Sequence, residues 1–251
     1  MVFIIMKKFK IHPMFLVVII LSIMMGLGSD LFTVILALII HECGHLMFLN
    51  IFKFKDNDIS FYPFGGVIDY ELKNDFLYKE ILISLGGVIF NLIFFYLFLK
   101  LKLFEMAHLN LFLLIINLIP VLPLDGGRVG LYLLSYVIPF KLSKIIICIF
   151  SVLVCVFLFI YYLVNYSGIY LLLLFAVVIK INVFTLITLK KEYNKFLLLK
   201  YLHPNKKFRK KLTKMWLSNP LENLYYQKSL IFNYDSFTIS EDELLNKNFK
   251  K

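Results

Sequence analysis

The sequence has few charged residues for its length. Of its 251 residues only 17% are charged, whereas 61% are hydrophobic, and the mean hydropathy is +0.83. A soluble protein of this length could not bury so much apolar surface, so the composition excludes a soluble globular enzyme and indicates a polytopic membrane protein. A single Trp accompanies 15 Tyr and 27 Phe, so Tyr and Phe must supply any aromatic anchoring at the membrane interface.

Cysteine is also scarce. Cys43, Cys148 and Cys155 lie in apolar stretches without a CxxC pair, which predicts three buried thiols. The chain has no convincing cleavable signal peptide, because its first apolar run is short and the segment from Met14 lacks a small-residue cleavage site.

Basic residues exceed acidic residues, and the net charge is +11. In a membrane protein this excess indicates cytoplasmic loops and anionic lipid, and we expect no nucleic-acid binding. Residues 190–214 contain ten of the basic residues and one acid, Glu192. The N-terminal lysine cluster consists of Lys7, Lys8 and Lys10. We expect this cluster and the basic tail on the cytoplasmic side, which requires an even number of spans.

The predicted fold class is an all-α polytopic membrane protein with six transmembrane helices and both termini in the cytoplasm. The predicted spans are residues 13–28, 31–52, 78–99, 109–139, 145–164 and 169–189. Residues 1–191 would form the membrane-embedded domain, and residues 192–251 a small basic cytoplasmic region. Within that region, Ser240 followed by Glu243 predicts a capped helix start.

The second span contains His41-Glu42-Cys43-Gly44-His45 near its middle. On a helix, His41 and His45 lie one turn apart on one face, so both imidazoles can bind one cation. Glu42 does not point at the same ion, and its usual role in this pattern is that of a general base toward water. Ionisable side chains inside a span are costly to bury, so they indicate function. The alternative is a polar cluster whose members satisfy one another.

The fourth span is interrupted by two prolines and two glycines in residues 117–128, which must break the helix. Asp125 is therefore an ionisable group at a membrane-embedded break, where a carboxylate needs a cation and the histidine pair needs a third ligand. The alternative is an ion pair between Asp125 and Arg128. Asn117 either donates a hydrogen bond to an oxyanion or substrate, or ties down the broken helix.

Residues 59–71, between the second and third spans, are rich in aromatic and β-branched residues and too short to span as a helix. We expect a β-hairpin or a re-entrant loop there. A strand edge at Phe64, Gly65 and Gly66 would suit an extended peptide substrate, which would add as a further strand. An ordinary interfacial loop is the alternative.

The third span contains two neighbouring glycines, Gly86 and Gly87, and a polar residue, Asn91. Paired glycines permit two helices to pack closely. We interpret Asn91 as a residue that holds helices together, since an amide can form hydrogen bonds across a helix interface.

The histidine motif and the Asp-Gly-Gly break together resemble the site-2 protease family of intramembrane metalloproteases, in which HExxH lies on one transmembrane helix and Asp-Gly follows a proline-rich break in another. The resemblance is strongest to family members that act in sporulation. The shared features are the sequences Lys-Ile-His-Pro at 10–13 and Tyr-Pro-Phe-Gly-Gly at 62–66, and the basic segment 195–201. The resemblance covers about residues 8–203.

This resemblance implies a zinc metalloendopeptidase with one catalytic zinc ion, held by His41, His45 and Asp125, with Glu42 as general base. Pro123 and the glycines beside it would leave room for an extended substrate. The implied reaction removes the pro-sequence of a membrane-associated sigma factor, sigma-K, in the mother cell of a spore-forming bacterium. Inhibitory membrane proteins are implied as partners.

Two features depart from many relatives: the last 60 or so residues are too few for a nucleotide-sensing CBS pair, and Gly86-Gly87 replaces a Gly-Pro sequence. Two other functions stay open. One is a related protease that cleaves another substrate, such as an anti-sigma factor or a signalling-peptide precursor. The other is a membrane metal transporter or sensor, although the first, fifth and sixth spans contain no acidic or histidine residue to line a pathway.

Overall fold

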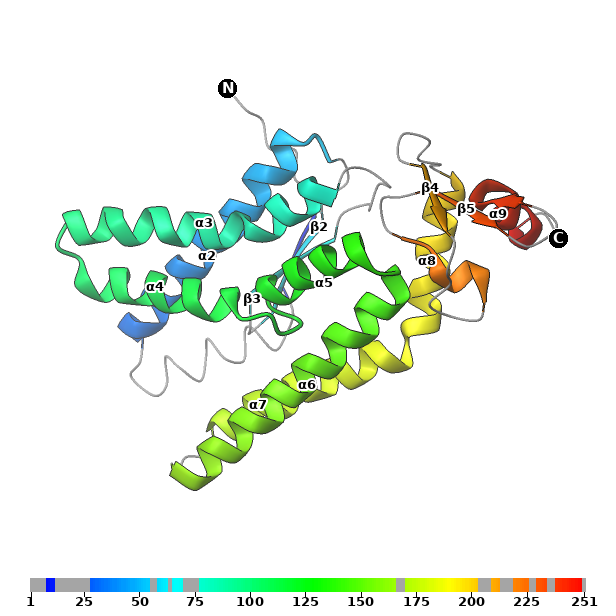
Figure 1. The fold of residues 1–251 in the computed structure, drawn as a ribbon. Helices are drawn as coiled ribbons and strands as arrows, with labels where there is room; N and C mark the ends of the chain where they lie inside the picture. The colour runs from blue at the N-terminus through cyan, green and yellow to red at the C-terminus, as the bar shows by residue number, and fades with distance from the viewer. Residues whose placement is uncertain are drawn as a thin grey trace. The chain divides into compact units, whose positions relative to one another are not determined.

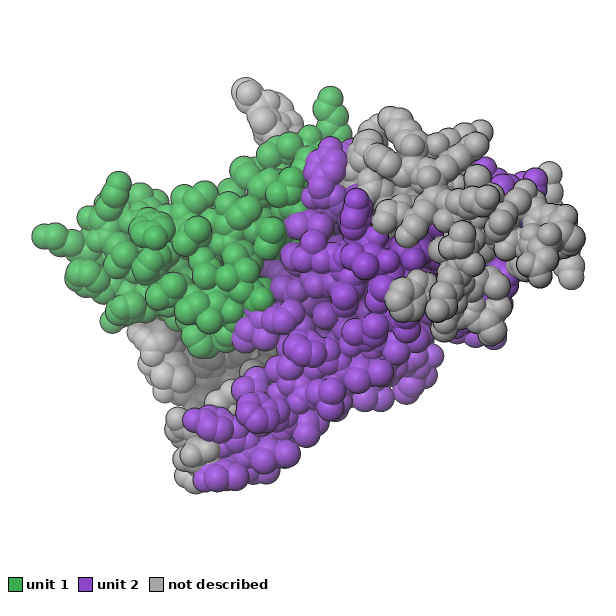
Figure 2. All heavy atoms as spheres, viewed as in Figure 1, with its two compact units in different colours: residues 1–71, 82–118 green, residues 72–81, 119–251 purple. Residues whose placement is uncertain are grey.

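The computed structural model is mostly helical (Figure 1). The residues that it describes are 8–11, 28–54, 58–62, 65–69, 77–165, 170–202, 209–212, 219–225, 229–233 and 238–249. The chain divides into two compact units, coloured separately in Figure 2. Unit 1 comprises residues 1–71 and 82–118, and unit 2 comprises residues 72–81 and 119–251.

Unit 1 is built on apolar helices. They are α2 (Gly28–Ile51), α3 (Leu77–Lys100), of which unit 1 contains the part from residue 82, and α4 (Phe104–Leu118). Ile40 of α2, Phe98 of α3 and Ala107 of α4 form one buried cluster, with further phenylalanines packed around it. This cluster holds the three helices together.

Helices α2 and α3 touch through their backbones at glycines. A Cβ atom built on Gly44 would lie 2.2 Å from the carbonyl oxygen of Gly86, and one built on Gly86 would lie 2.6 Å from that of Gly44. Only glycine permits this approach, because any larger residue would place carbon inside the neighbouring backbone. The prediction of close packing at Gly86 and Gly87 is confirmed.

Unit 1 also contains a three-stranded sheet of β1 (Lys8–Ile11), β2 (Asp58–Tyr62) and β3 (Gly65–Asp69). The central strand β2 pairs in parallel with β1 and antiparallel with β3, so β3 is an edge strand of this sheet. Strand β3 lies against α2. The sequence predicts a β-hairpin or a re-entrant loop over residues 59–71, where β2 and β3 pair, but its local pattern does not predict β1, whose partner strand lies about fifty residues away. A location of these strands in or on the membrane stays a prediction.

Besides the start of α3, unit 2 contains the break at residues 119–124 and, after it, four helices before the C-terminal part. They are α5 (Asp125–Val137), α6 (Phe140–Asn165), α7 (Tyr170–Ile187) and α8 (Leu189–Leu202). Helices α6 and α7 pack along each other, and α5 packs on α6 (Figure 1). The predicted interruption of the fourth span is confirmed by the gap between α4 and α5.

The C-terminal part of unit 2 contains a second small sheet and two short helices. The elements are β4 (Arg209–Leu212), the 3-10 helix η1 (Pro220–Asn223), β5 (Ser229–Asn233), β6 (Thr238–Ser240) and α9 (Glu241–Phe249). The predicted capped helix start is confirmed: the Glu243 N–H donates to Ser240 Oγ at 3.3 Å, and the Ser240 N–H donates to Glu243 Oε2 at 3.2 Å.

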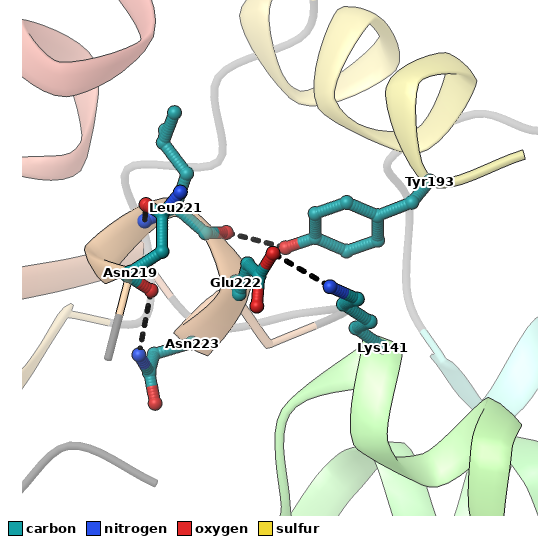
Figure 3. Close-up of polar contacts among 6 residues, drawn as sticks. All are labelled: Lys141, Tyr193, Asn219, Leu221, Glu222 and Asn223. Atoms are coloured by element: carbon teal, nitrogen blue, oxygen red, sulfur yellow. Dashed lines mark hydrogen bonds and ion pairs between the residues drawn. The ribbon is translucent and has the colours of Figure 1, made fainter. Parts of the chain in front are cut away.

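This C-terminal part shares a hydrophobic core with the helices of unit 2. The buried members of the core are Leu77, Tyr132, Tyr193, Phe196, Leu197, Leu224, Tyr225, Leu230 and Leu245. Figure 3 shows the polar contacts of η1, in which the Tyr193 hydroxyl donates to the Leu221 carbonyl and Lys141 Nζ lies 2.6 Å from Glu222 Oε1. Burial and nearby carboxylates raise the pKa of Tyr193, so its hydroxyl stays protonated as the donor.

The prediction of a basic, lipid-facing tail is wrong for Lys200, which is buried. Its side chain is 2% exposed, and its Nζ lies 2.7 Å from Glu241 Oε1, while Glu241 Oε2 accepts the Leu230 N–H at 2.9 Å. Burial lowers the pKa of Lys200, and the negative charge of Glu241 opposes that shift. The pair joins α8 to α9 and β5, so Lys200 is a structural residue and not part of a lipid-binding surface.

Three of the described helical segments are long and apolar enough to cross a membrane: Phe32–Ile51, Leu77–Lys100 and Phe140–Tyr161. Two shorter apolar helical segments are Phe104–Leu118 and Val178–Ile187. Large apolar side chains on α6 are exposed, as expected for a helix that faces lipid. Apart from Gly28, the predicted first span lies outside the described residues, so the number of six spans stays a prediction.

Candidate metal centre

The face of α2 that packs on α3 carries His41 and His45. Both side chains are buried, and their Nε2 atoms lie 3.2 Å apart, with the rings edge to face. Two nitrogen ligands at about 2.0–2.1 Å from one tetrahedral zinc ion lie about 3.3 Å from each other. The separation of the two Nε2 atoms therefore fits the binding of one metal ion.

Helix α3 contacts the opposite side of both imidazole rings. The Ile83 carbonyl oxygen lies 2.7 Å from His45 Nδ1. Because a carbonyl oxygen only accepts, this contact puts the proton on Nδ1 and directs the lone pair of Nε2 toward His41. A Cβ atom on Gly87 would lie 2.4 Å from His41 Cε1, so glycine makes room for the second ring.

The amide of Asn91 completes the contacts that α3 makes with this pair. Asn91 is fully buried, and its Nδ2 lies 3.2 Å from His41 Nδ1. Sequence analysis interpreted Asn91 only as a residue that joins helices. A signal was present, because Ile83, Gly87 and Asn91 are spaced four residues apart and so share one face of α3.

Two of the three residues between His41 and His45, Glu42 and Cys43, differ in their surroundings. Glu42 is 5% exposed, which is rare for a carboxylate and typical of a functional group in an apolar helix. Cys43 is exposed, whereas Cys148 and Cys155 are buried. The prediction of a buried thiol at Cys43 is wrong, because residue 43 projects from the side of α2 opposite His41 and His45.

His41 and His45 belong to unit 1, whereas Asp125 belongs to unit 2, and all three side chains are buried. Asp125 as the third ligand of the histidine pair stays a prediction. Two imidazole nitrogens and one carboxylate oxygen are a common ligand set for catalytic zinc, which leaves a fourth position for water or substrate.

Asp125 is the first residue of α5 and is 6% exposed. The glycine two residues later lets the preceding break fold back over the first turn of the helix. A Cβ atom on Gly127 would lie 2.5 Å from the backbone nitrogen of Leu122 and 2.5 Å from the carbonyl carbon of Val121. The sequence Asp-Gly-Gly thus allows a tight backbone crossing immediately beside the carboxylate.

Two polar side chains from other helices bind the backbone of the break. The Leu122 N–H donates to Ser151 Oγ of α6 at 2.9 Å, and Asn182 Nδ2 of α7 donates to the Leu122 carbonyl at 2.7 Å. Ser151 and Asn182 are fully buried. Backbone groups outside a helix ladder need such partners in an apolar environment. Sequence analysis missed both residues, although each is a polar residue inside an apolar span.

The residues predicted to bind substrate lie in several elements. Asn117 Nδ2 donates to the Leu113 carbonyl, one turn earlier in α4, at 3.0 Å. This hydrogen bond fits the alternative in which Asn117 holds the end of the broken helix. Pro123 lies in the break, two residues before α5. Gly65 and Gly66 begin the edge strand β3, and Phe64 lies outside the described residues. Their contact with substrate stays a prediction.

Comparison with known proteins agrees with the family resemblance read from the motifs. Residues 30–106 match the model of Peptidase family M50. The chain is 27% identical over 144 residues to Stage IV sporulation protein FB of Bacillus subtilis (strain 168), an alignment that covers 53% of this chain and 50% of that protein. The chain thus spans about half the length of this curated relative.

A solved structure is also similar. The site-2 protease from Methanocaldococcus jannaschii matches with a TM-score of 0.53 and 24% sequence identity, over 73% of this chain and 89% of that chain. This likeness shows a shared fold. The resemblance to the site-2 protease family, and within it to the sporulation protein, is confirmed.

Proposed function

We propose that this relative of the M50 peptidases is an intramembrane zinc metalloprotease that hydrolyses a peptide bond in a membrane-associated protein. The observation that carries the proposal is the histidine pair of α2, buried in an apolar helix, with Nε2 atoms 3.2 Å apart. In metalloproteases, the two histidines of an HExxH motif on one helix face bind the catalytic zinc ion. The similarity to M50 peptidases over residues 30–106 covers this helix and supports the assignment.

The donor set fits zinc. His41 and His45 would hold the ion through Nε2, and Asp125 would complete the set through a carboxylate oxygen. A zinc ion held there supplies Lewis-acid activation of water and of the scissile carbonyl at neutral pH. Two neutral imidazoles and one carboxylate leave the site with a net positive charge, which suits that role.

Glu42 performs the proton transfers in this proposal. Its carboxylate takes a proton from the attacking water and later gives it to the leaving amine. Its side chain is buried and follows His41 directly in α2, so the carboxylate belongs to the same helical turn as the histidine pair. Asn117 would donate to the developing oxyanion if its amide leaves its bond within α4.

The substrate must be extended to expose its scissile carbonyl. Strand β3 supports this requirement, because it is an edge strand that starts at Gly65 and lies against the helix of the histidine pair. An extended peptide could pair with this edge, and Pro123 in the break would leave it room. A contact of Phe64 with the substrate is part of the same proposal.

We propose a sigma-K precursor as the substrate, on the basis of the family resemblance and the similarity to a sporulation protein. The setting is then a multi-pass membrane protein of a spore-forming bacterium, with both termini in the cytoplasm on the mother-cell side. Inhibitory membrane proteins and anionic lipid at the remaining basic residues of the tail are further proposed partners. Cleavage of an anti-sigma factor or of a signalling-peptide precursor is the second candidate.

The test is co-expression of the chain with a tagged sigma-K precursor from the same genome. We expect shortening of the precursor with the wild type and none with Glu42→Gln, which should keep wild-type zinc content because it alters no proposed ligand. Asp125→Ala should lose both cleavage and zinc. Equal shortening by the wild type and Glu42→Gln would reject the mechanism, and no shortening by either would direct the assay to the second class of substrate.

A further inference from the structure

The two histidines of α2 are oriented by different kinds of group. His45 Nδ1 contacts a backbone carbonyl, that of Ile83, which can only accept a hydrogen bond. His41 Nδ1 contacts a side-chain amide, that of Asn91, which can donate through Nδ2 or accept through Oδ1. Only the His45 tautomer is therefore fixed by the backbone, and the His41 tautomer depends on which end of Asn91 faces it.

The tautomer decides whether His41 can bind a metal ion through Nε2. If Asn91 donates to Nδ1, the ring proton is on Nε2 and the lone pair that a metal needs is lost. If Asn91 accepts from Nδ1–H, the lone pair is on Nε2, beside that of His45 at 3.2 Å. A half-turn of the amide about its terminal bond exchanges Oδ1 and Nδ2 without moving any other group.

A cation held by both Nε2 atoms requires the accepting orientation, because each Nε2 must then direct a lone pair at the ion. Asn91 is fully buried, and its Oδ1 has no hydrogen-bond partner among the described residues when Nδ2 faces the ring. Turning Oδ1 toward His41 gives this acceptor the Nδ1–H of the ring. The backbone carbonyl opposite His45 already provides the same arrangement one turn further along α2. Each imidazole would then donate through Nδ1 to an oxygen atom on α3.

We propose that Asn91 is a positioning residue of the metal centre, which accepts the Nδ1–H of His41 through Oδ1 and so holds the Nε2 lone pair toward the ion. This inference rests on the proposed metal site. An outer hydrogen bond of this kind fixes the ring and strengthens the ligand, and its loss commonly weakens metal affinity about 10–100-fold.

The experiment measures zinc retention in purified full-length protein, by metal analysis after dialysis against a series of chelator concentrations. Asn91→Leu has nearly the same volume and no polar group, and we expect its zinc affinity to fall about 10–100-fold. Asn91→Asp presents only acceptor oxygens when ionised, and we expect zinc affinity at or above that of the wild type. If Asn91→Asp loses zinc as Asn91→Leu does, the accepting role is rejected.

A matched control separates positioning from packing. Asn110 is also a fully buried asparagine of unit 1, but its Nδ2 donates to the Met106 carbonyl of its own helix at 2.8 Å. We expect Asn110→Leu to keep wild-type zinc affinity even if its thermal stability falls. If both leucine variants lower stability and neither changes zinc affinity, Asn91 only packs helices and the inference is wrong.

The outcome is distinguishable from failure of the proposed function. Wild-type protein that retains no zinc would reject the metal site itself, and this inference with it. Wild-type protein that retains zinc, with unchanged retention in Asn91→Leu, would reject this inference alone. Zinc analysis needs no substrate, so an incorrect choice of substrate leaves the result unaffected.

Discussion

Helix α2 is continuous through the histidine motif, whereas residues 119–124 interrupt the predicted fourth span between α4 and α5. In the continuous helix the backbone satisfies its own hydrogen bonds, and the side chains need partners, which α3 supplies at Ile83 and Asn91. In the interruption the backbone itself needs partners, which Ser151 and Asn182 supply. An apolar environment thus demands support for polar side chains in one region and for the main chain in the other.

The two regions also use glycine differently. Gly44 of α2 lets the backbones of two helices touch, so that α3 reaches the histidines. Gly127 of α5 instead lets the break cross its own helix beside Asp125. Close approach brings supporting groups to the ligands in the first case and sets the path of the chain in the second.

The largest effect is expected from Gly44→Ala. Its Cβ atom would lie 2.2 Å from the Gly86 carbonyl oxygen, and backbone cannot move aside as a side chain can. We expect a loss of stability beyond the ~1–3 kcal/mol typical of overpacking, together with loss of zinc. Thermal unfolding in detergent and metal analysis measure both.

The control is the same substitution at Gly130 of α5. Among the described residues, a Cβ atom there meets the flexible Cδ1 of Ile147 at 3.2 Å and a proline carbon at 3.8 Å. We expect Gly130→Ala to unfold within a few degrees of the wild type. Similar unfolding temperatures for Gly44→Ala and Gly130→Ala would contradict the proposed importance of the backbone contact.

A smaller effect is expected from removing the partners of the break. Asn182→Leu leaves the Leu122 carbonyl without its donor, and Ser151→Ala leaves the Leu122 N–H without its acceptor. Each should cost about 1–3 kcal/mol, the penalty of a buried unsatisfied group. The double variant should cost less than the two together, because both bonds hold the same residue. Urea or thermal unfolding measures the three values.

Thr185→Val is the control for this set. Thr185 lies on α7 like Asn182, but its hydroxyl makes an exposed hydrogen bond to the Ile181 carbonyl of its own helix. We expect no measurable change in stability. If Thr185→Val loses as much stability as Asn182→Leu, α7 is sensitive to any substitution. The effect of Asn182→Leu would then not show that Asn182 stabilises the break.

The smallest effect on stability is expected from Asn117→Ala, at about 0.5–1.5 kcal/mol, since its amide bonds a carbonyl within α4. Cleavage of the precursor distinguishes its two predicted roles. If Asn117 is an oxyanion donor, its removal should lower kcat about 10²–10³-fold with zinc content unchanged. If Asn117→Ala has the kcat of the wild type, Asn117 has no part in catalysis and only forms its hydrogen bond within α4.

Several features of the fold could be predicted from the sequence because their signals are local. The spacing of His41 and His45, the interruption before Asp125 and the cap at Ser240 each depend on residues within one or two turns. Helix periodicity and the chemistry of proline and glycine determine these features wherever the chain folds. The presence of several apolar helices follows from composition in the same way.

Other features required partners far away in the chain. Strand β1 exists through pairing with β2, and Lys200 is buried because Glu241 compensates its charge. A sequence shows the basic residue but not the partner that removes it from solvent. The interpretation of Lys200 as part of a lipid-facing tail failed for that reason.

The sequence by itself determined the chemistry that this protein can offer: two imidazoles one turn apart, a carboxylate between them, and a second carboxylate at a helix break. Only the tertiary structure decided how these groups are supported. The carbonyl that orients His45 is separated from it by 38 positions, and the amide beside His41 by 50. A backbone carbonyl leaves no trace in residue identity, and contacts over such separations follow from helix packing rather than from local pattern.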